Sequence, residues 1–170
     1  SAPQPDEASL LVVADGVASE QGGEVASATA TTYLTRALVP FLAALAIAGS
    51  KRSYAGSIPR ALDRVLREAN QTILRARAAE PKFRGMATTV VCAVVADDIL
   101  RVAWAGDSRA YLCRGGGVTQ LTEDHSEAAK LIHAGVITPD EAKFHPLAHV
   151  ITNNLGRDDF QPAVKGWRIQ

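Results

Sequence analysis

Several features that mark specialised proteins are scarce in this sequence. The two cysteines, Cys92 and Cys113, are too few for a disulfide-stabilised fold, and no CxxC pair indicates a metal site. The 18 basic and 18 acidic side chains balance, whereas nucleic-acid-binding domains usually carry a basic excess. The longest apolar run, residues 37–48, is well short of the roughly 20 residues that a membrane span needs. We therefore expect neither nucleic acid nor a membrane as a partner.

The composition otherwise fits an ordinary globular protein. Of the 170 residues, 47% are hydrophobic, which is enough for the core of a single domain and too apolar for intrinsic disorder. No basic region followed by an apolar stretch opens the sequence, so we expect a cytoplasmic location. We find no internal repeat, low-complexity tract or interdomain linker.

Charge is unevenly spread along the chain. Residues 51–84 hold nine bases against three acids, and residues 1–50 hold one base against five acids. Apolar residues from Ile58 to Ala76 recur at the i, i+3, i+4, i+7 spacing of an amphipathic helix. The bases fall mostly on the other side of this helix, so a solvated helix face explains them better than a phosphate-binding or acidic-partner patch.

Local signals set the limits of the helices. Ser57 is the expected N-cap of the amphipathic helix, and Glu80-Pro81 marks its end. An earlier helix is expected over residues 22–39, with Pro40 kinking or ending it because proline lacks an amide donor. Two short helices are expected later, one over residues 126–134 and one that begins at the capping box of residues 138–141.

Strands account for the remaining patterns. Residues 9–14 are expected to form a buried strand that ends in the Asp15-Gly16 turn. Residues 88–96 and 99–105 are expected to form a hairpin that turns at Asp97-Asp98. Another hairpin is expected around the glycine triplet 115–117, which is followed by a strand rather than by the helix that a phosphate loop needs. Antiparallel strands with adjacent helices predict an α+β domain in which helices cover a sheet or sandwich.

Two aspartates stand at strand ends where a metal ion could bind. Asp15 follows the first strand, and Asp107 follows the strand that ends at residue 105. Carboxylates at converging strand ends suit hard cations such as Mg²⁺ or Mn²⁺. Taken alone, Asp15-Gly16 fits an ordinary turn better, because Asp-Gly is also the commonest turn pair.

Other arrangements of reactive residues are less convincing. His145 and His149 have the i, i+4 spacing of a helical metal pair, but Pro146 and the lack of a third ligand nearby favour a structural role. Residues 124–126 contain the types found in a serine hydrolase triad, but no GxSxG motif is present. Cys92 is expected to be a buried thiol.

Seven segments together resemble a known family. In order along the chain they are residues 11–17 (LVVADGV), 23–27 (GEVAS), 86–89 (MATT), 105–112 (AGDSRAYL), 120–126 (QLTEDHS), 145–146 (HP) and 151–156 (ITNNLG). This ordered set, spread over nearly the whole chain, resembles the bacterial branch of the metal-dependent Ser/Thr protein phosphatases, the type 2C or PPM family.

The resemblance implies a fold and a metal site. The family fold is a β-sandwich of antiparallel sheets with a helix pair on each outer face. By resemblance, Asp15 bridges two Mg²⁺ or Mn²⁺ ions, Gly16 contributes its carbonyl directly or through water, and Asp107 helps to hold a third ion. A water bound by the metals then attacks phosphorus in line.

The resemblance also implies supporting residues and a flap. Thr88, Thr89 and Ser108 are expected to support the site. Residues 126–153, with His145 and Asn153, correspond to a mobile flap that influences substrate choice.

The sequence departs from the family pattern in three places. Glu20 stands where family members often carry a histidine proposed as general acid, so Glu20 is a candidate acid and protonation of the leaving group is unassigned. The family's first strand, with its phosphate-binding arginine, is expected before Leu10 but is missing. The last strands, with further metal ligands, are expected after residues 165–169 and are missing too, so we expect one phosphatase-like domain over residues 1–170 that is incomplete at both ends.

Two functions are consistent with these features. In the first, the protein hydrolyses phosphoserine or phosphothreonine in proteins and opposes a Ser/Thr kinase in signal transduction. In the second, it is an inactive binding or regulatory module that keeps the fold without a complete site.

Overall fold

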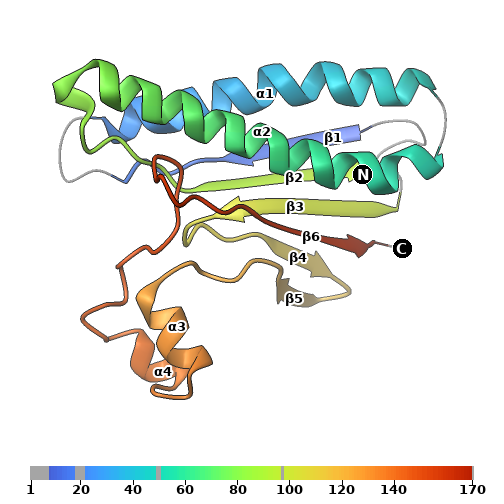
Figure 1. The fold of residues 1–170 in the computed structure, drawn as a ribbon. Coiled ribbons are helices and arrows are strands. Elements are labelled where there is room, and N and C mark those ends of the chain that lie inside the picture. Colours follow the sequence, from blue (N-terminus) through green and yellow to red (C-terminus); the bar gives the residue numbers. More distant parts are fainter. Residues whose placement is uncertain (1–7, 18–21, 49–50, 97, 170) are drawn as a thin grey trace.

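The computed structural model describes residues 8–17, 22–48, 51–96 and 98–169. In chain order the elements are β1 (Ala8–Val13), α1 (Gly23–Ala48), α2 (Lys51–Ala79), the 3-10 turn η1 (Pro81–Phe83), β2 (Val90–Ala96), β3 (Ile99–Ala105), β4 (Tyr111–Arg114), β5 (Gly117–Gln120), α3 (Glu127–His133), α4 (Pro139–Ala142) and β6 (Ala163–Arg168). Figure 1 shows the two long helices on one face of a sheet and the β4–β5 hairpin on the other. The predicted α+β class is confirmed.

The larger sheet has four strands in the order β1-β2-β3-β6, all antiparallel. The predicted β2–β3 hairpin is confirmed by pairing of Ala96 with Ile99, although Asp97 of its turn lies outside the described residues. The prediction that the first strand is buried is wrong. Because β1 is an edge strand with only one covered face, Leu11 and Val13 are 56% and 59% exposed.

Helices α1 and α2 cover one face of this sheet (Figure 1). The amphipathic pattern correctly predicts the buried side of α2, which includes Ile58, Leu62 and Leu66. We predicted that α2 would start at Ser57, but it starts at Lys51 and contains Pro59. Packing of the apolar side outweighs the single hydrogen bond that this proline removes.

Helix α1 also runs past a proline that was expected to interrupt it. Pro40 was predicted to kink or end the helix near residue 39, but α1 continues to Ala48. Leu38 and Leu42 are buried on either side of Pro40, while Pro40 and Arg36 are exposed. The carbonyl left without an amide partner therefore faces water, and the buried leucines keep the helix in place.

By length and composition alone, α1 could also cross a membrane. Gly23–Ile47 is the one segment among the described residues that satisfies these criteria. One side of α1, however, packs in the core of this fold through Ala26, Leu34 and Leu38. A core helix meets the same criteria, so this finding does not change the expected partners.

The other face of the sheet is covered by the β4–β5 hairpin. Val102 and Trp104 of β3 and the nearby Leu121 are buried there. Gly115 and Gly116 have positive φ angles, 56° and 78°, which glycine adopts readily in a hairpin turn. The predicted hairpin is confirmed, but no second helix pair covers it within the described part of the chain.

Helices α3 and α4 lie instead on the side of the sheet that carries the β4–β5 hairpin, near one end of the sheet (Figure 1). Their caps agree with the sequence signals. Ser126 Oγ accepts a hydrogen bond from the amide of Ala129, 3.1 Å away. Thr138 and Glu141 form a complete capping box.

Candidate metal centre at one end of the sheet

The strand register brings the predicted site segments to the same end of the large sheet. Val13 pairs with Val91, and Val90 pairs with Ala105. The residues after β1, those before β2 and those after β3 are therefore neighbours at this end. They include Asp15, Gly16, Thr88, Thr89, Asp107 and Ser108.

Two buried threonines fix the main chain of Asp15. The amide of Thr89 and the hydroxyl of Thr88 both donate to the carbonyl oxygen of Asp15, each at 2.9 Å. The amide of Asp15 donates to Thr89 Oγ1 at 3.2 Å. Hydrogen bonds thus hold both the amide and the carbonyl of Asp15, the residue that carries this carboxylate.

A close approach of two glycines brings α1 to the same place. A Cβ atom on Gly16 would lie 2.2 Å from the carbonyl oxygen of Gly23, the first residue of α1. Gly16 therefore has no room for a side chain on the side that faces Gly23, although the residue itself is exposed.

The Asp107 segment is joined to Asp15 through Thr89. The hydroxyls of Thr89 and Ser108 lie 2.7 Å apart. Gly106 has a φ of 109°, and a Cβ atom there would lie 2.6 Å from the Cβ of Thr89. In the described part of the chain, no hydrogen bond or ion pair occupies the carboxylate of Asp15 or of Asp107, so both remain available to a ligand.

His125 lies beside this turn. The amide of Gly106 donates to His125 Nδ1 at 3.2 Å, and the ring stacks on Trp104 with centroids 6.1 Å apart. Burial lowers the pKa of His125, with smaller opposing effects of the Glu123 and Asp124 carboxylates. Sequence reasoning did not select His125 for the site, although it lies in the quoted segment 120–126.

The ligand types at this end suit a divalent cation, but their number is small. Mg²⁺ and Mn²⁺ prefer oxygen ligands and take about six. Asp15 and Asp107 offer free carboxylates, and the exposed Gly16 offers a backbone carbonyl. No group of three or more His, Cys, Asp or Glu side chains suited to a metal occurs among the residues that the structure describes.

Comparison with known proteins identifies the family. The family described as "Protein phosphatase 2C" matches residues 2–155. The chain belongs to the protein phosphatase 2C family. The serine/threonine phosphatase stp of Listeria innocua is 33% identical over 151 residues, which cover 89% of this chain and 57% of that protein. This phosphatase 2C chain thus spans a little over half the length of that relative.

Solved structures of phosphatases agree with the fold. The Mycobacterium tuberculosis serine/threonine phosphatase PstP/Ppp has a TM-score of 0.80 and 29% identity, covering 98% of this chain and 68% of that chain. The catalytic domain of PstP in complex with two manganese ions has a TM-score of 0.75 and 28% identity, covering 98% of this chain and 67% of that chain.

Some predicted site residues of this phosphatase 2C chain lie elsewhere. Glu20 is outside the described residues. His145 lies in the loop after α4, where its Nδ1 accepts from the amide of Leu147 at 3.2 Å. His145 and His149, for which a structural role was expected rather than a metal pair, belong to no group of three or more metal-binding side chains among the described residues. Cys92 is buried, as predicted, and burial raises the pKa of its thiol to about 12.

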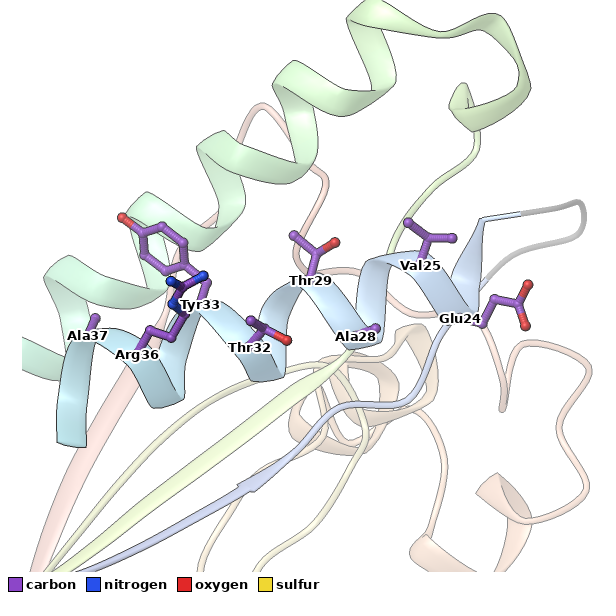
Figure 2. Close-up of a pocket in the computed structure, with 8 residues that line it drawn as sticks. All are labelled: Glu24, Val25, Ala28, Thr29, Thr32, Tyr33, Arg36 and Ala37. Carbon is purple, nitrogen blue, oxygen red and sulfur yellow. The ribbon is translucent and has the colours of Figure 1, made fainter.

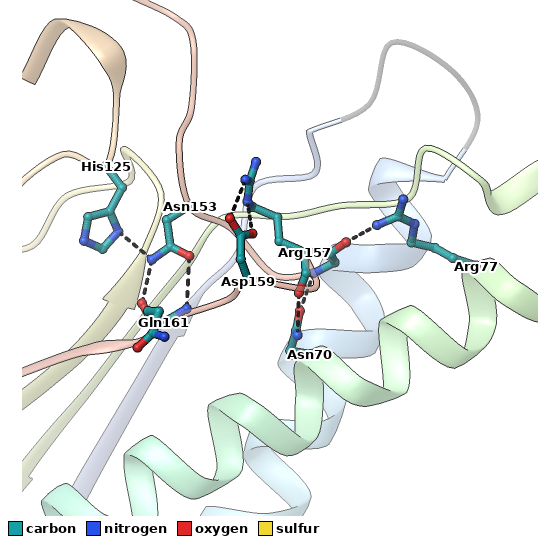
Figure 3. A network of polar contacts seen from close by, with 8 residues as sticks. Asn70, Arg77, His125, Asn153, Arg157, Asp159 and Gln161 are labelled. Atoms are coloured by element: carbon teal, nitrogen blue, oxygen red, sulfur yellow. Dashed lines mark hydrogen bonds and ion pairs between the residues drawn. The ribbon is translucent and has the colours of Figure 1, made fainter. Parts of the chain in front are cut away.

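Asn153 of the predicted flap does reach the site region. Its Nδ2 lies 3.3 Å from His125 Nδ1 and donates to the carbonyl of Gln161 at 2.6 Å (Figure 3). On the other side of this loop, buried Asn70 of α2 donates to the carbonyl of Arg157 at 2.9 Å. The loop between the flap and β6 is therefore tied both to His125 and to the helical layer.

Two large hollows and a smaller one of about 490 Å³ beside Arg77 and Arg157 lie on the described part of this phosphatase 2C chain. One, of about 1310 Å³, extends from Asp107 and His125 between the β4–β5 hairpin and α3–α4. The other, of about 960 Å³, follows α1 past Ala28, Thr29 and Tyr33 (Figure 2). The first contains a free carboxylate and adjoins the candidate metal centre, whereas the second contains no grouping of reactive side chains.

Proposed function

We propose that the protein hydrolyses phosphoserine and phosphothreonine in other proteins with the help of Mg²⁺ or Mn²⁺. The observation that carries this proposal is the pair of free carboxylates, Asp15 and Asp107, at one sheet end and joined through Thr89. The similarity to serine/threonine phosphatases over most of the chain supports the reaction.

Asp15, Gly16 and Asp107 would hold the metal ions. The catalytic domain of PstP in complex with two manganese ions supports a site for two ions. A third ion at Asp107 is proposed from the family resemblance alone. Bound divalent cations supply a water whose pKa is low enough for it to attack phosphorus at neutral pH. Activity measured with each metal separately distinguishes Mg²⁺ from Mn²⁺.

This chain's own residues orient the site. Thr88 and Thr89 hold the backbone of Asp15, so that its carboxylate projects from the end of β1. Gly16 is exposed and has no side chain, which allows α1 to approach it through Gly23. Ser108 fixes the segment of Asp107 through Thr89. Glu20 remains our candidate for protonating the leaving oxygen.

The flap and the partners complete the proposal. Residues 126–153 border the hollow at Asp107 and would influence which phosphoprotein is accepted. The substrates would be proteins phosphorylated by a Ser/Thr kinase that the phosphatase opposes, in the cytoplasm. All residues are proposed to belong to one phosphatase domain.

The test is phosphate release from a phosphothreonine peptide, measured with increasing Mn²⁺ or Mg²⁺. We expect metal-dependent release that falls at least about 100-fold in Asp15→Asn, because the amide is a poor ligand. Asp63→Asn is the matched control, since Asp63 only pairs with Arg67 on the exposed side of α2. Absence of release with either metal, or equal activity of Asp15→Asn, would contradict the proposal and favour the binding or regulatory module.

A further inference from the structure

His125 lies where three segments of the chain meet. The first is the turn after β3, because the amide of His125 donates to the carbonyl of Gly106 at 3.0 Å. The second is the start of the flap, because the next residue, Ser126, is the N-cap of α3. The third is the return of the flap, because the amide of Thr152 donates to the carbonyl of His125 at 2.8 Å.

The imidazole adds a contact that the main chain alone does not provide. The amide of Gly106 can only donate, so His125 Nδ1 must accept and carries no proton. A neutral ring then has its proton on Nε2. Stacking on Trp104, with an interplanar angle of 9°, fixes the plane of the ring. One nitrogen is therefore committed to the turn that carries Asp107.

Asn153 links the same nitrogen to the end of the flap. Its side-chain amide exchanges two hydrogen bonds with the backbone of Gln161, donating at 2.6 Å and accepting at 3.4 Å. This pair of bonds determines which end of the amide is Nδ2. Nδ2 is thus a donor 3.3 Å from His125 Nδ1, and the nitrogen receives donors from both the turn and the flap.

The two ends of the flap are also fastened directly to each other. Ser126 pairs with Ile151, and the amide of Glu127 donates to the carbonyl of Val150 at 2.9 Å. The flap is therefore a closed loop, and the imidazole of His125 joins its base to the Asp107 turn. A shift of the turn would reach the flap base through the main-chain bond of His125 to Gly106 and also through its imidazole.

We propose that His125 is a positioning residue that fixes the Gly106-Asp107 turn and, through Asn153, holds the base of the flap in a fixed relation to it. The effect on metal binding rests on the function proposed above, in which Asp107 is a metal ligand. The effect on the turn and flap does not.

Two substitutions separate the Nδ1 contact from the mere presence of a polar side chain. In His125→Asn the side-chain oxygen falls near the position of Nδ1, whereas in His125→Gln it falls near that of Nε2. Hydrogen exchange, resolved by residue with NMR, reports the amides of Gly106 and Thr152. The amide of Cys92, in the middle of β2, is the internal control for global stability.

In His125→Asn we expect the amides of Gly106 and Thr152 to exchange at rates within about twofold of those in the original protein. In His125→Gln we expect both amides to exchange about five- to tenfold faster, because one hydrogen bond is lost. The exchange rate of the Cys92 amide should not change. Equal exchange of the two variants at Gly106, or faster exchange at all three amides alike, would overturn the proposal. Failure of both variants to fold would also overturn it, because the asparagine supplies the acceptor.

Mn²⁺ binding measured by calorimetry extends the test to the metal centre. We expect Mn²⁺ to bind His125→Gln several-fold more weakly than His125→Asn. If neither the original protein nor the variants bind Mn²⁺, the proposed metal function fails, while the exchange data still decide the positioning role. Equal Mn²⁺ affinity of the two variants, despite different exchange at Gly106, would contradict the link to Asp107.

Discussion

The hydroxyl of Thr89 lies 2.7 Å from the hydroxyl of Ser108, and the same Thr89 oxygen accepts a hydrogen bond from the amide of Asp15. These contacts connect the segment after β1 with the segment after β3, at the end of the sheet where the backbone hydrogen bonds between the strands end. Asp107 is the neighbour of Ser108 in the chain. One buried threonine therefore influences the placement of both carboxylates of the candidate metal centre.

Removal of this hydroxyl is expected to weaken the sheet end. Thr89→Val keeps the shape of the side chain but leaves the amide of Asp15 and the hydroxyl of Ser108 without this partner. We expect the free energy of unfolding in urea to fall by about 1–3 kcal/mol. Thr89→Ser, which retains the hydroxyl, should lose less.

Thr72→Val is the control for the loss of a threonine hydroxyl. Its hydroxyl bonds only to the carbonyl of Glu68 in the same helix, at 3.0 Å. The unfolding free energy of this variant should change by less than about 0.5 kcal/mol. If Thr89→Val were no more destabilised than Thr72→Val, the linking role of Thr89 would be wrong.

A side chain at Gly106 is expected to disrupt the same contact. Its φ of 109° is unfavourable for other residues, and an added Cβ would overlap the side chain of Thr89 at 2.6 Å. Gly106→Ala should therefore reduce the unfolding free energy by about 2–4 kcal/mol. Gly85→Ala is the matched control, because no atom lies within 4 Å of its added Cβ. Similar unfolding midpoints for the two variants would contradict this packing argument.

Local sequence signals were sufficient for the elements whose contacts are close in sequence. The β-branched run and the short Asp-Asp turn predict the β2–β3 hairpin, and Thr138 with Glu141 predicts the start of α4. Asp15 and Asp107 could be selected because each stands two residues after the end of a strand. In the hairpin and the helix cap the interacting residues are few positions apart, so the pattern itself contains the information.

Contacts between distant residues were not visible in the same way. Strand β6 was not predicted, and its Gly166 fits because the side chain of Arg101 from β3 fills the space beside it. The continuation of α1 through Pro40 depends on a core built from other elements. The position of His125 depends on the β3 turn and on the return of the flap, which is 27 residues later at Thr152. Only the assembled fold brings these groups together.

Acid should selectively weaken the contact made by His125. Burial lowers its pKa below the ordinary value of 6.5, so the folded protein binds this proton less readily than the unfolded chain does. The facing carboxylates of Glu123 and Asp124 oppose this effect, and the shift remains downward. The contribution of neutral His125 to stability is therefore fully present above pH 6.5 and decreases as the pH falls from there through its folded pKa.

Unfolding in urea between pH 8 and pH 5 should show a larger loss of stability for the original protein than for His125→Asn, which cannot be protonated at this position. The other three histidines are common to both proteins, so their contributions to stability cancel in the difference. A difference that stays constant over this range, or that changes in the opposite direction, would mean that His125 is not held neutral by its surroundings.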